Sequence, residues 1–325
     1  MLQSPDKRID LPDLALQPQR ELDSISSVLS FLDPQAPFAA SLATGDEWSF
    51  QFPRFDGLEF AAILKGSCWI AVAGMPAPLQ LSRGDCFLLP ATRSYRMTSD
   101  LDLKPVDADS VFSNLPYGKA QYGAGNSTVI VGARFTFDRN QMAILLDTLP
   151  PLVHIRARSG AASKIPLLLD QFAEELAGAE PGSALMVAHL AHMLFVSALR
   201  AYLASGETLH AGWLGALADP KMARVLNSLH SQPGRRWTLR DLTAVAGMSR
   251  SVFCLRFKQL VGLAPLDYLL QWRIQIAAKD LRTTSKTLAE IAYSLGYESE
   301  SAFAHAFQRV IKTTPRQYRN RNQLA

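Results

Sequence analysis

The stretch Thr238-Leu-Arg-Asp-Leu242 is repeated further along the chain as Thr287-Leu-Ala-Glu-Ile291. A glycine follows each copy, and the residues beyond it recur in order: Gly247, Phe253, Phe257, Pro265 and Tyr268 correspond to Gly296, Phe303, Phe307, Pro315 and Tyr318. A repeat of this kind indicates two similar supersecondary units. We therefore expect two copies of one small structure between residues 237 and 318.

Each copy has the residue types that begin and end a short helix. Thr238 and Thr287 are each followed three residues later by a carboxylate, which predicts a capping box at a helix start. The glycine then ends that helix in a tight turn. In the next helix, phenylalanines four residues apart form a buried stripe, which leaves the opposite face polar and outward. This order predicts a helix-turn-helix unit, whose second helix enters a DNA major groove.

The charge of the chain is divided unevenly. The net charge is +4, yet the residues from Pro220 onward contain 17 Lys and Arg against 6 Asp and Glu, so the remainder is acidic. A basic module joined to an acidic one is typical of nucleic-acid binding, because neutralised phosphates supply much of the affinity. A merely solvated basic face is the alternative that charge alone leaves open.

The chain upstream of the repeat changes texture at about residue 137. Between residues 39 and 137, short apolar runs separated by Gly, Asp and Pro predict an all-β barrel or sandwich. The later spacing is helical, and the segment 183–203 is apolar on nearly every side, so it must be buried on several faces. Its apolar run is interrupted by His189 and His192 and is too short for a bilayer. We read these two as core or interface histidines, because no third metal ligand is evident.

Targeting and cysteine usage indicate a cytoplasmic protein with no membrane segment. The N-terminus lacks the apolar region of a signal peptide. Three cysteines, at positions 68, 86 and 254, do not form a disulfide framework.

The C-terminal third resembles the DNA-binding domain of the AraC/XylS family of bacterial transcription regulators. The matching residues are Arg273-Ile-x-x-Ala277-x-x-x-Leu281, Ile291-Ala292-x-x-x-Gly296-Tyr297, Phe303-x-x-x-Phe307 and Thr314-Pro315. The segment 64–90, with Gly66, Gly84-Asp85 and Pro90, is similar to the cupin sensor domain of one branch of that family. The resemblance implies an α+β protein. A cupin-like effector-sensing and dimerisation domain would span residues 1–210, and a DNA-binding domain with two helix-turn-helix units would span 211–325.

The resemblance also implies which residues contact DNA. In the family a long helix, expected here from about Leu266 to Leu281, joins the two units so that they enter successive major grooves. Carried over by position, the base-facing residues are Ser251, Cys254, Leu255, Ser301, Ala304 and His305, flanked by Arg250 and Glu300. Several are small or apolar, which favours contacts with thymine methyl groups over bidentate bonds to guanine. The candidates for phosphate contacts are Arg250, Arg256, Lys258, Arg273 and Arg309.

The sensor region offers aromatic and cysteine candidates. The barrel segment contains no histidine, so we expect no metal, no cofactor and no catalytic residue; a cupin enzyme tethered to DNA is the less favoured alternative. Effector-pocket candidates are Trp48, Phe60, Trp69, Phe87 and Tyr95, each of which could equally be barrel core. Cys68 and Cys86 are either small buried residues or a thiol-redox sensor. A sensor requires the two sulfurs to approach and at least one to be exposed with a lowered pKa.

Sequence and resemblance together predict a sequence-specific transcription regulator, not an enzyme. Its expected partners are double-stranded DNA, an unknown small-molecule effector, a second copy of the chain, and RNA polymerase if it is an activator. For an effector to regulate, it must bind two arrangements of the protein with different affinities.

Overall fold

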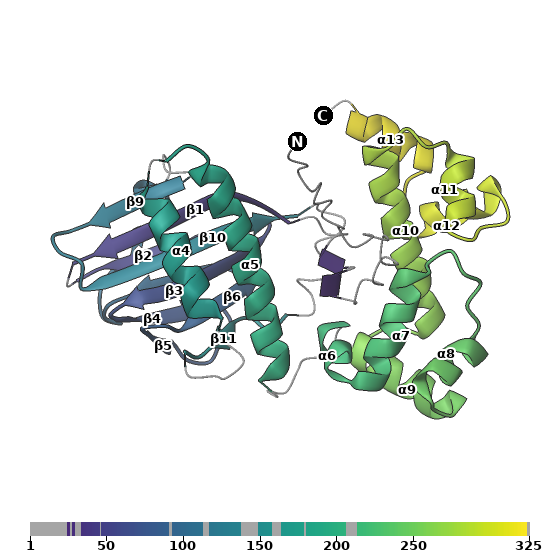
Figure 1. The fold of residues 1–325 in the computed structure, drawn as a ribbon, viewed down its shortest axis with the longest axis horizontal. Helices are drawn as coiled ribbons and strands as arrows, with labels where there is room; N and C mark the ends of the chain where they lie inside the picture. Colours follow the sequence, from purple (N-terminus) through teal and green to yellow (C-terminus); the bar gives the residue numbers. More distant parts are fainter. Residues whose placement is uncertain are drawn as a thin grey trace, which may run out of the picture.

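The chain folds into a sheet-rich part followed by an all-helical part (Figure 1). The computed structural model describes residues 25–26, 28–29, 34–45, 47–90, 93–112, 117–137, 149–157, 164–178, 180–205 and 213–323. The domain boundary expected at residue 210 lies outside these ranges. The arrangement confirms the predicted α+β class, with the β structure confined to the N-terminal half.

The strands form two sheets whose neighbours pair mainly in antiparallel fashion. The larger sheet has the order β11-β6-β3-β10-β1-β9 and the smaller has the order β5-β4-β7-β2-β8. The larger consists of β1 (Gln35–Thr44), β3 (Leu58–Lys65), β6 (Cys86–Pro90), β9 (Tyr117–Tyr122), β10 (Thr128–Thr136) and β11 (Val153–Ile155). The smaller consists of β2 (Ser49–Phe52), β4 (Ser67–Val72), β5 (Leu79–Ser82), β7 (Tyr95–Thr98) and β8 (Val106–Asp107), and the short helix α2 (Asp109–Phe112) follows it.

Alternation along the strands of the larger sheet feeds two separate hydrophobic cores. Successive side chains of a strand point to opposite faces. In β3, Phe60 and Ala62 belong to a core on the outer face, whereas Ala61 and Ile63 belong to the core between the two sheets. The same strand therefore supports both the barrel interior and the layer outside it.

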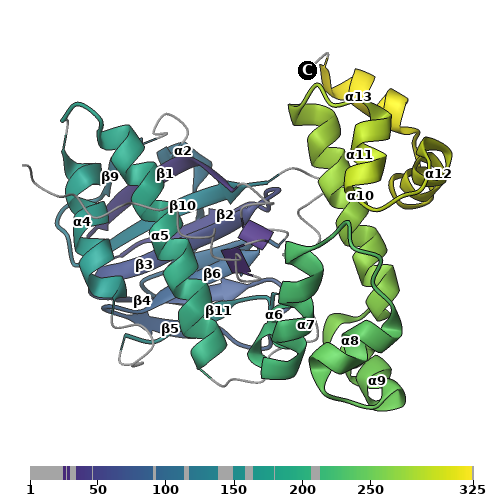
Figure 2. The ribbon, with the colours of Figure 1, turned by 45° about the vertical axis from the view of Figure 1, so that its right-hand side comes forward.

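Two helices cover the outer face of the larger sheet. Helices α4 (Ile165–Ala177) and α5 (Ser183–Ala204) lie side by side across it in both ribbon views (Figures 1 and 2). The sequence analysis judged the apolar run of this segment too short for a bilayer, but the complete helix α5 is long and apolar enough to cross a membrane by length and composition. Its buried residues, including Leu194, Phe195 and Leu199, instead pack into the outer core with β-strand residues such as Phe135. We therefore read α5 as a core helix.

The helical part consists of eight helices among the described residues. They are α6 (Trp213–Ala218), α7 (Pro220–Ser231), α8 (Leu239–Ala246), α9 (Arg250–Val261), α10 (Pro265–Thr283), α11 (Leu288–Ser294), α12 (Glu300–Ile311) and α13 (Pro315–Gln323). The pairs α8–α9 and α11–α12 are the two predicted helix-turn-helix units. They lie at opposite ends of α10, which is the predicted connecting helix (Figures 1 and 2).

The two predicted capping boxes of the repeat are present, and three of its four helix starts have a side-chain cap. Thr238 and Thr287 each accept a bond from the backbone amide three residues on, and both capping boxes are complete. Ser299 likewise caps α12, accepting from the Ala302 amide at 3.1 Å. Ser249 occupies the N-cap of α9 but makes no side-chain cap bond. Of the two serine N-caps, only Ser299 therefore makes a side-chain cap bond.

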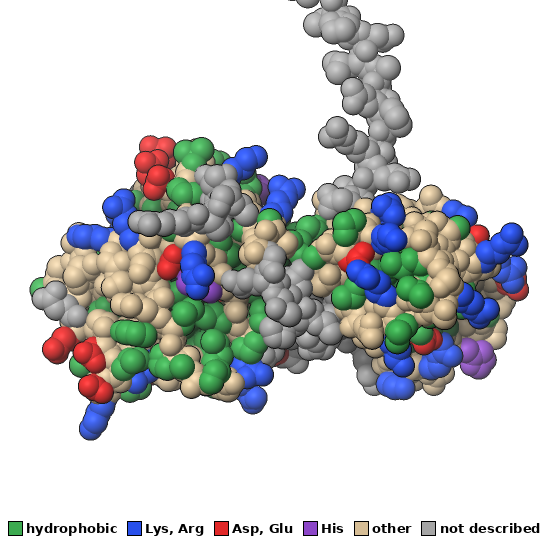
Figure 3. Space-filling model, turned by 90° about the horizontal axis from the view of Figure 1, so that it is seen from below, with side chains coloured by type: hydrophobic (Ala, Val, Ile, Leu, Met, Phe, Trp, Pro, Cys, Tyr) green, Lys and Arg blue, Asp and Glu red, His purple; other side chains and the backbone are tan. Residues whose placement is uncertain are grey.

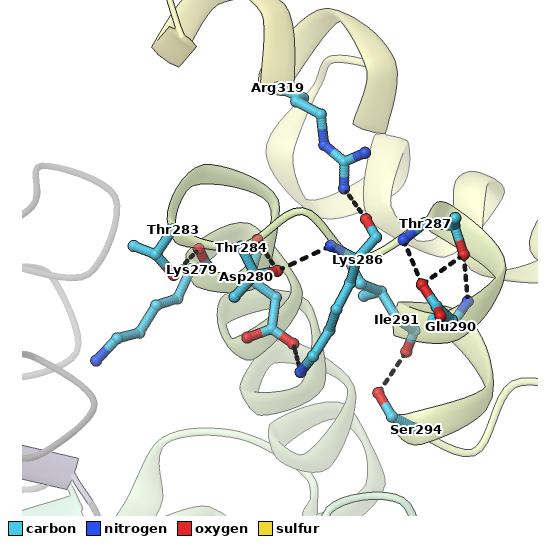
Figure 4. A network of polar contacts seen from close by, with 10 residues as sticks. All are labelled: Lys279, Asp280, Thr283, Thr284, Lys286, Thr287, Glu290, Ile291, Ser294 and Arg319. Atoms are coloured by element: carbon cyan, nitrogen blue, oxygen red, sulfur yellow. Dashed lines mark hydrogen bonds and ion pairs between the residues drawn. The ribbon is translucent and has the colours of Figure 1, made fainter.

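Polar contacts fix the start of the second unit against the end of α10 (Figure 4). Lys286 lies in the connection and its Nζ bonds Asp280 Oδ2 on α10 at 2.9 Å. The Lys286 carbonyl accepts from Arg319 of α13 at 2.5 Å. Side chains from α10 and α13 thus hold the segment that leads into the Thr287 cap.

Helix α10 contributes to three hydrophobic cores in succession. Tyr268 and Leu269 near its start belong to the core of the first unit, and the four residues Ile274, Ala277, Ala278 and Leu281 belong to that of the second. Between them, Trp272 belongs to the outer core of the N-terminal part, together with Leu214 of α6. Trp272 is therefore a point at which the two parts of the chain share packing.

Candidate DNA-binding surface and sensor pocket

The helices α9 and α12 present nearly the same pattern of buried and exposed positions. The phenylalanine pairs Phe253 with Phe257 and Phe303 with Phe307 are fully buried, as the repeat predicts. On the other face, Ser251, Leu255, Ser301 and His305 are exposed, while Cys254 and Ala304 are half-buried. The structure thus places the six predicted base-facing residues on or beside the outer face of each second helix.

The first unit exposes two large apolar side chains, and contact of such side chains with water is unfavourable. Leu255 is 62% exposed and Val252, which the sequence analysis did not select, is 53% exposed. The two lie three positions apart on α9 and so share a side of the helix. Sequence reasoning missed Val252 because, beside the positions opposite the phenylalanine stripe, it selected flanking residues only on the side of Arg250 and Cys254. Apolar side chains at a groove-facing helix suit contact with thymine methyl groups.

Three of the predicted phosphate-contacting residues are exposed and available. Arg250 and Lys258 on α9 and Arg309 on α12 lie at exposed positions, and within the described residues none is paired with a carboxylate. Lys and Arg side chains spread over the helical part at the right of Figure 3, with few acidic groups among them. This surface can neutralise phosphates without first breaking an internal ion pair.

Arg256 and Arg273, the other two predicted phosphate contacts, each bind groups of the protein itself, and Arg256 remains exposed while Arg273 is half-buried. Arg256 forms an ion pair with Asp219, and its Nε donates to Asp219 Oδ2 at 2.7 Å. The same carboxylate caps the start of α7. Arg273 donates from Nε to the Pro233 carbonyl at 2.6 Å and from a terminal nitrogen to the Arg235 carbonyl at 2.8 Å. Sequence could not reveal these partners because they lie 37 to 40 residues away.

The Arg273 contacts belong to a junction between the two helix-turn-helix units. The guanidinium also lies over the Tyr297 ring, 5.8 Å from its centroid. Gly234, beside the Pro233 carbonyl, packs backbone to backbone against Gly296 in the turn of the second unit. An exposed ion pair of 3.0 Å between Arg236 and Glu298 lies in the same region. The loop 233–236 therefore ties the first unit to the turn of the second.

The negative charge of Glu300 would repel DNA phosphates, but a nearby arginine partly compensates it. Glu300 lies in the first turn of α12, where a carboxylate interacts favourably with the positive end of the helix dipole. Its Oε1 lies 3.8 Å from a terminal nitrogen of Arg316, a residue that the sequence analysis did not select. Arg316 is largely exposed and adds positive charge next to the predicted Glu300 position.

A pocket opens inside the barrel, between the two sheets. Its empty volume is about 500 Å³, part of it open to solvent. Most of its lining is apolar, and a buried ion pair between Glu59 and Arg134 supplies the charge. The lining residues are Phe38, Ala40, Leu42, Trp48, Phe52, Glu59, Ala61, Met97, Phe112, Ile130, Gly132, Ala133 and Arg134.

The predicted effector residues are distributed between this pocket and its surroundings. Trp48 lines the pocket. Tyr95 and Phe87 are buried in the core between the sheets, beside the pocket but outside its lining. Phe60 points into the outer core on the other face of β3, and Trp69 is half-buried on β4. The larger or charged pocket residues that sequence reasoning missed are Phe38, Phe52, Glu59, Phe112 and Arg134. Their convergence depends on strand register, which the sequence did not determine.

Glu59, Tyr95 and Arg134 interact with one another, and Glu59 and Arg134 also line the pocket. Arg134 Nε lies 3.4 Å from Glu59 Oε2, and the two side chains are only 20% and 12% exposed. Burial raises the pKa of Glu59, and the Arg134 charge opposes that rise. Burial and the neighbouring Glu59 charge raise the pKa of Tyr95 well above its usual value. Arg134 also lies over the rings of Phe38 and Phe55, at 5.3 and 5.0 Å from their centroids.

The geometry of Cys68 and Cys86 counts against a thiol-redox sensor. Cys68 belongs to the core between the sheets, whereas Cys86 belongs to the outer core. Both side chains are buried, and burial raises the pKa of each thiol to about 12. A sensor needs the opposite conditions, an accessible thiol with a lowered pKa. Both cysteines therefore match the alternative interpretation of small core residues.

The structure gives no support for a metal centre among the residues it describes. No group of three or more His, Cys, Asp or Glu side chains comes together there. Both ring nitrogens of His192 face carbonyl oxygens, with Nδ1 2.6 Å from that of Ala188 and Nε2 2.5 Å from that of Pro34. His189 is exposed on α5. The two histidines therefore do not act as a pair.

A cupin-type sheet domain followed by two helix-turn-helix units defines a DNA-binding transcription regulator, and comparison with known proteins agrees. Residues 23–204 match the family model described as Cupin, and residues 242–321 match the one described as Helix-turn-helix domain. An AraC-like transcription regulator of Streptomyces lividans is 39% identical over 92% of this chain and 98% of its own length. The chain belongs to the AraC-like transcription regulators.

Two further similarities were found. The HTH-type transcriptional regulator AlkR of Acinetobacter baylyi is 28% identical over 93% of this chain and 100% of its own length. The solved structure of the DNA-binding domain of AdpA with a target DNA is 31% identical. That match covers 33% of this chain and 95% of the AdpA domain, with a TM-score of 0.31.

Proposed function

We propose that this regulator inserts α9 and α12 into successive major grooves of double-stranded DNA, and that a small molecule bound in its N-terminal domain changes that docking. The observation that carries the first half is the matched exposure of the two helices at the ends of α10. A 19-residue helix is about 28 Å long, close to the roughly 34 Å between successive major grooves. The domains would be residues 1–210 and 211–325.

The DNA contacts are tested by removing one exposed cation from each unit. Lys258→Ala and Arg309→Ala should each weaken binding to an operator selected from random-sequence DNA by the wild-type protein. Each should also reduce the slope of log affinity against log salt by about one. Lys104→Ala, which removes an exposed charge from the sheet-rich part, is the matched control. Unchanged affinity and slope in both unit variants would show that the proposed docking is wrong.

We also propose that the protein is a homodimer that uses the outer face of α4 and α5. Among the exposed large apolar side chains of the described residues, Leu167 lies on α4 and Leu185, Met186 and Met193 lie on α5, each between 48% and 66% exposed. Such a patch on a soluble protein marks an interaction surface. Leu185→Lys with Met193→Lys should convert a dimer to a monomer in sedimentation equilibrium, whereas Leu101→Lys on a barrel turn should not. A double variant that stays dimeric would exclude this face.

Coupling between the two parts would pass through the packing at α6 and Trp272. Helix α6 contacts α5 on one side and α7 and α9 on the other. Trp272 of α10 shares the core of the N-terminal part. An effector that favours one packing of this junction shifts the presentation of both units. We infer that the protein acts in the cytoplasm, as a regulator rather than an enzyme. If it is an activator, it would contact RNA polymerase. Transcription reconstituted from purified components would test that contact.

A further inference from the structure

The pocket inside the barrel contains a hydrogen-bond donor without an acceptor. The indole Nε1–H of Trp48 is buried and has no hydrogen-bond partner among the described residues, and the Trp48 side chain lines the pocket. Trp48 as a whole is 2% exposed, so water in the bulk cannot satisfy this group. Buried tryptophans ordinarily find an acceptor for this hydrogen. An unsatisfied hydrogen-bond donor therefore belongs to a side chain of the pocket wall.

The walls around this donor are built for apolar rings. Phe38, Phe52 and Phe112 line the pocket with Trp48. The centroid of the Phe112 ring lies 6.0 Å from that of Phe38 and 6.1 Å from that of Phe52. Edge and offset contacts of this kind favour flat apolar molecules. The main body of a ligand is therefore apolar, and polar recognition is limited to a few groups.

The charge in the pocket is already balanced. Arg134 and Glu59 form one ion pair, 3.4 Å between the nearest atoms, at the pocket edge. An anionic or cationic ligand would bring an uncompensated charge into a buried site, which is strongly unfavourable. A neutral oxygen acceptor satisfies the indole without disturbing the pair.

We propose that the pocket binds a small, uncharged, largely apolar molecule whose oxygen accepts a hydrogen bond from the Trp48 indole N–H. The inference rests on the proposed effector function and names the chemistry of its ligand. Phe38 lies on β1, and the carbonyl oxygen of Pro34, the residue before that strand, lies 2.5 Å from Nε2 of His192 on α5. The pocket wall is thus connected directly to the helix that leads toward the DNA-binding part.

Three probes of one shape separate the possible recognition chemistries. Acetophenone carries a neutral acceptor, ethylbenzene lacks it, and benzoate adds a negative charge. The indole N–H signals of the full-length protein, ¹⁵N-labelled at tryptophan, are followed by NMR during titration. Acetophenone should bind about fivefold more tightly than ethylbenzene, the contribution of one neutral hydrogen bond, and should move the Trp48 signal most. Benzoate should bind most weakly.

A pair of tryptophan variants identifies the donor. Trp48→Phe keeps the ring but removes the N–H, so the preference for acetophenone over ethylbenzene should disappear. Trp69→Phe, outside the pocket lining, should retain it. The inference is overturned if no probe binds, if benzoate binds most tightly, or if Trp48→Phe keeps the preference. DNA affinity is measured on the same samples, so that failure of the pocket assignment can be told from failure of the proposed function. A protein that binds DNA normally but binds no probe would reject only the pocket assignment.

Discussion

The two turn glycines of the repeat offer a comparison within one molecule. Both have a left-handed backbone, with φ of 60° at Gly247 and 79° at Gly296. A side chain at Gly247 would meet nothing within 4 Å. A Cβ at Gly296 would lie 2.2 Å from the carbonyl oxygen of Gly234 and 3.0 Å from its carbon. Gly296→Ala and Gly247→Ala therefore differ mainly in whether the junction between the units can remain closed.

The expected magnitudes follow from these contacts. A left-handed alanine destabilises by about 1–2 kcal/mol, and this is the whole expected effect of Gly247→Ala. Gly296→Ala adds an overlap with backbone atoms, which cannot rotate away, and overpacking of that kind typically adds about 1–3 kcal/mol. The total of about 2–5 kcal/mol is a large share of a typical domain stability of about 5–15 kcal/mol. The overlap is relieved when the loop 233–236 separates from the second unit.

Calorimetric unfolding of the full-length variants measures the first effect, and DNA binding measures the second. Gly296→Ala should lose affinity for an operator containing both half-motifs while retaining most affinity for a DNA with one. Gly247→Ala should keep its preference for the complete operator. Equal destabilisation by the two substitutions, or full operator affinity in Gly296→Ala, would falsify the claim that this glycine contact orients the units.

Two other predictions concern stability. Burial lowers the pKa of His230 to about 3, so below about pH 6.5 the unfolded chain binds a proton that the folded protein does not. The free energy of unfolding should therefore fall by about 2 kcal/mol from pH 7 to pH 5 because of this group. In denaturant titrations, His230→Gln should not show this fall. The same dependence of unfolding free energy on pH in both proteins would contradict the prediction. Thr287→Ala should lower the stability of the second unit by about 1 kcal/mol, whereas Thr287→Ser should not, as judged by amide exchange in α11.

The DNA-binding part could be predicted almost completely from sequence because its determinants are local. Caps, turn glycines and phenylalanine stripes act over a few residues, and both predicted capping boxes form, at Thr238 and at Thr287. The same locality explains the correct exposure of Ser251 and His305. The intramolecular partners of Arg256 and Arg273 required tertiary knowledge, because those groups approach the two side chains only after folding.

The sensor pocket could be predicted only in kind. A barrel of alternating strands was evident, but strand register decides which alternate side chains face inward. Phe60 and Glu59 are neighbours in sequence, yet they face opposite sides of β3, one toward the outer core and one toward the pocket. Hydrophobicity alone favoured Phe60, and it gave no reason to select a buried carboxylate. Its partner Arg134 lies on β10, paired with β3 at Glu59.

The participation of α10 in three cores has a consequence for the operators this regulator uses. One continuous helix fixes the separation of the two reading units, and the N-terminal core meets it at Trp272, near its midpoint. A change in the packing of the N-terminal core against Trp272 can tilt the two helix-turn-helix units together, but it cannot lengthen the helix between them. All operators should therefore share one spacing between half-motifs, in the presence or absence of effector. Regulation would appear as a change in how many operators are occupied at a given protein concentration, with the footprint length of each unit pair unchanged.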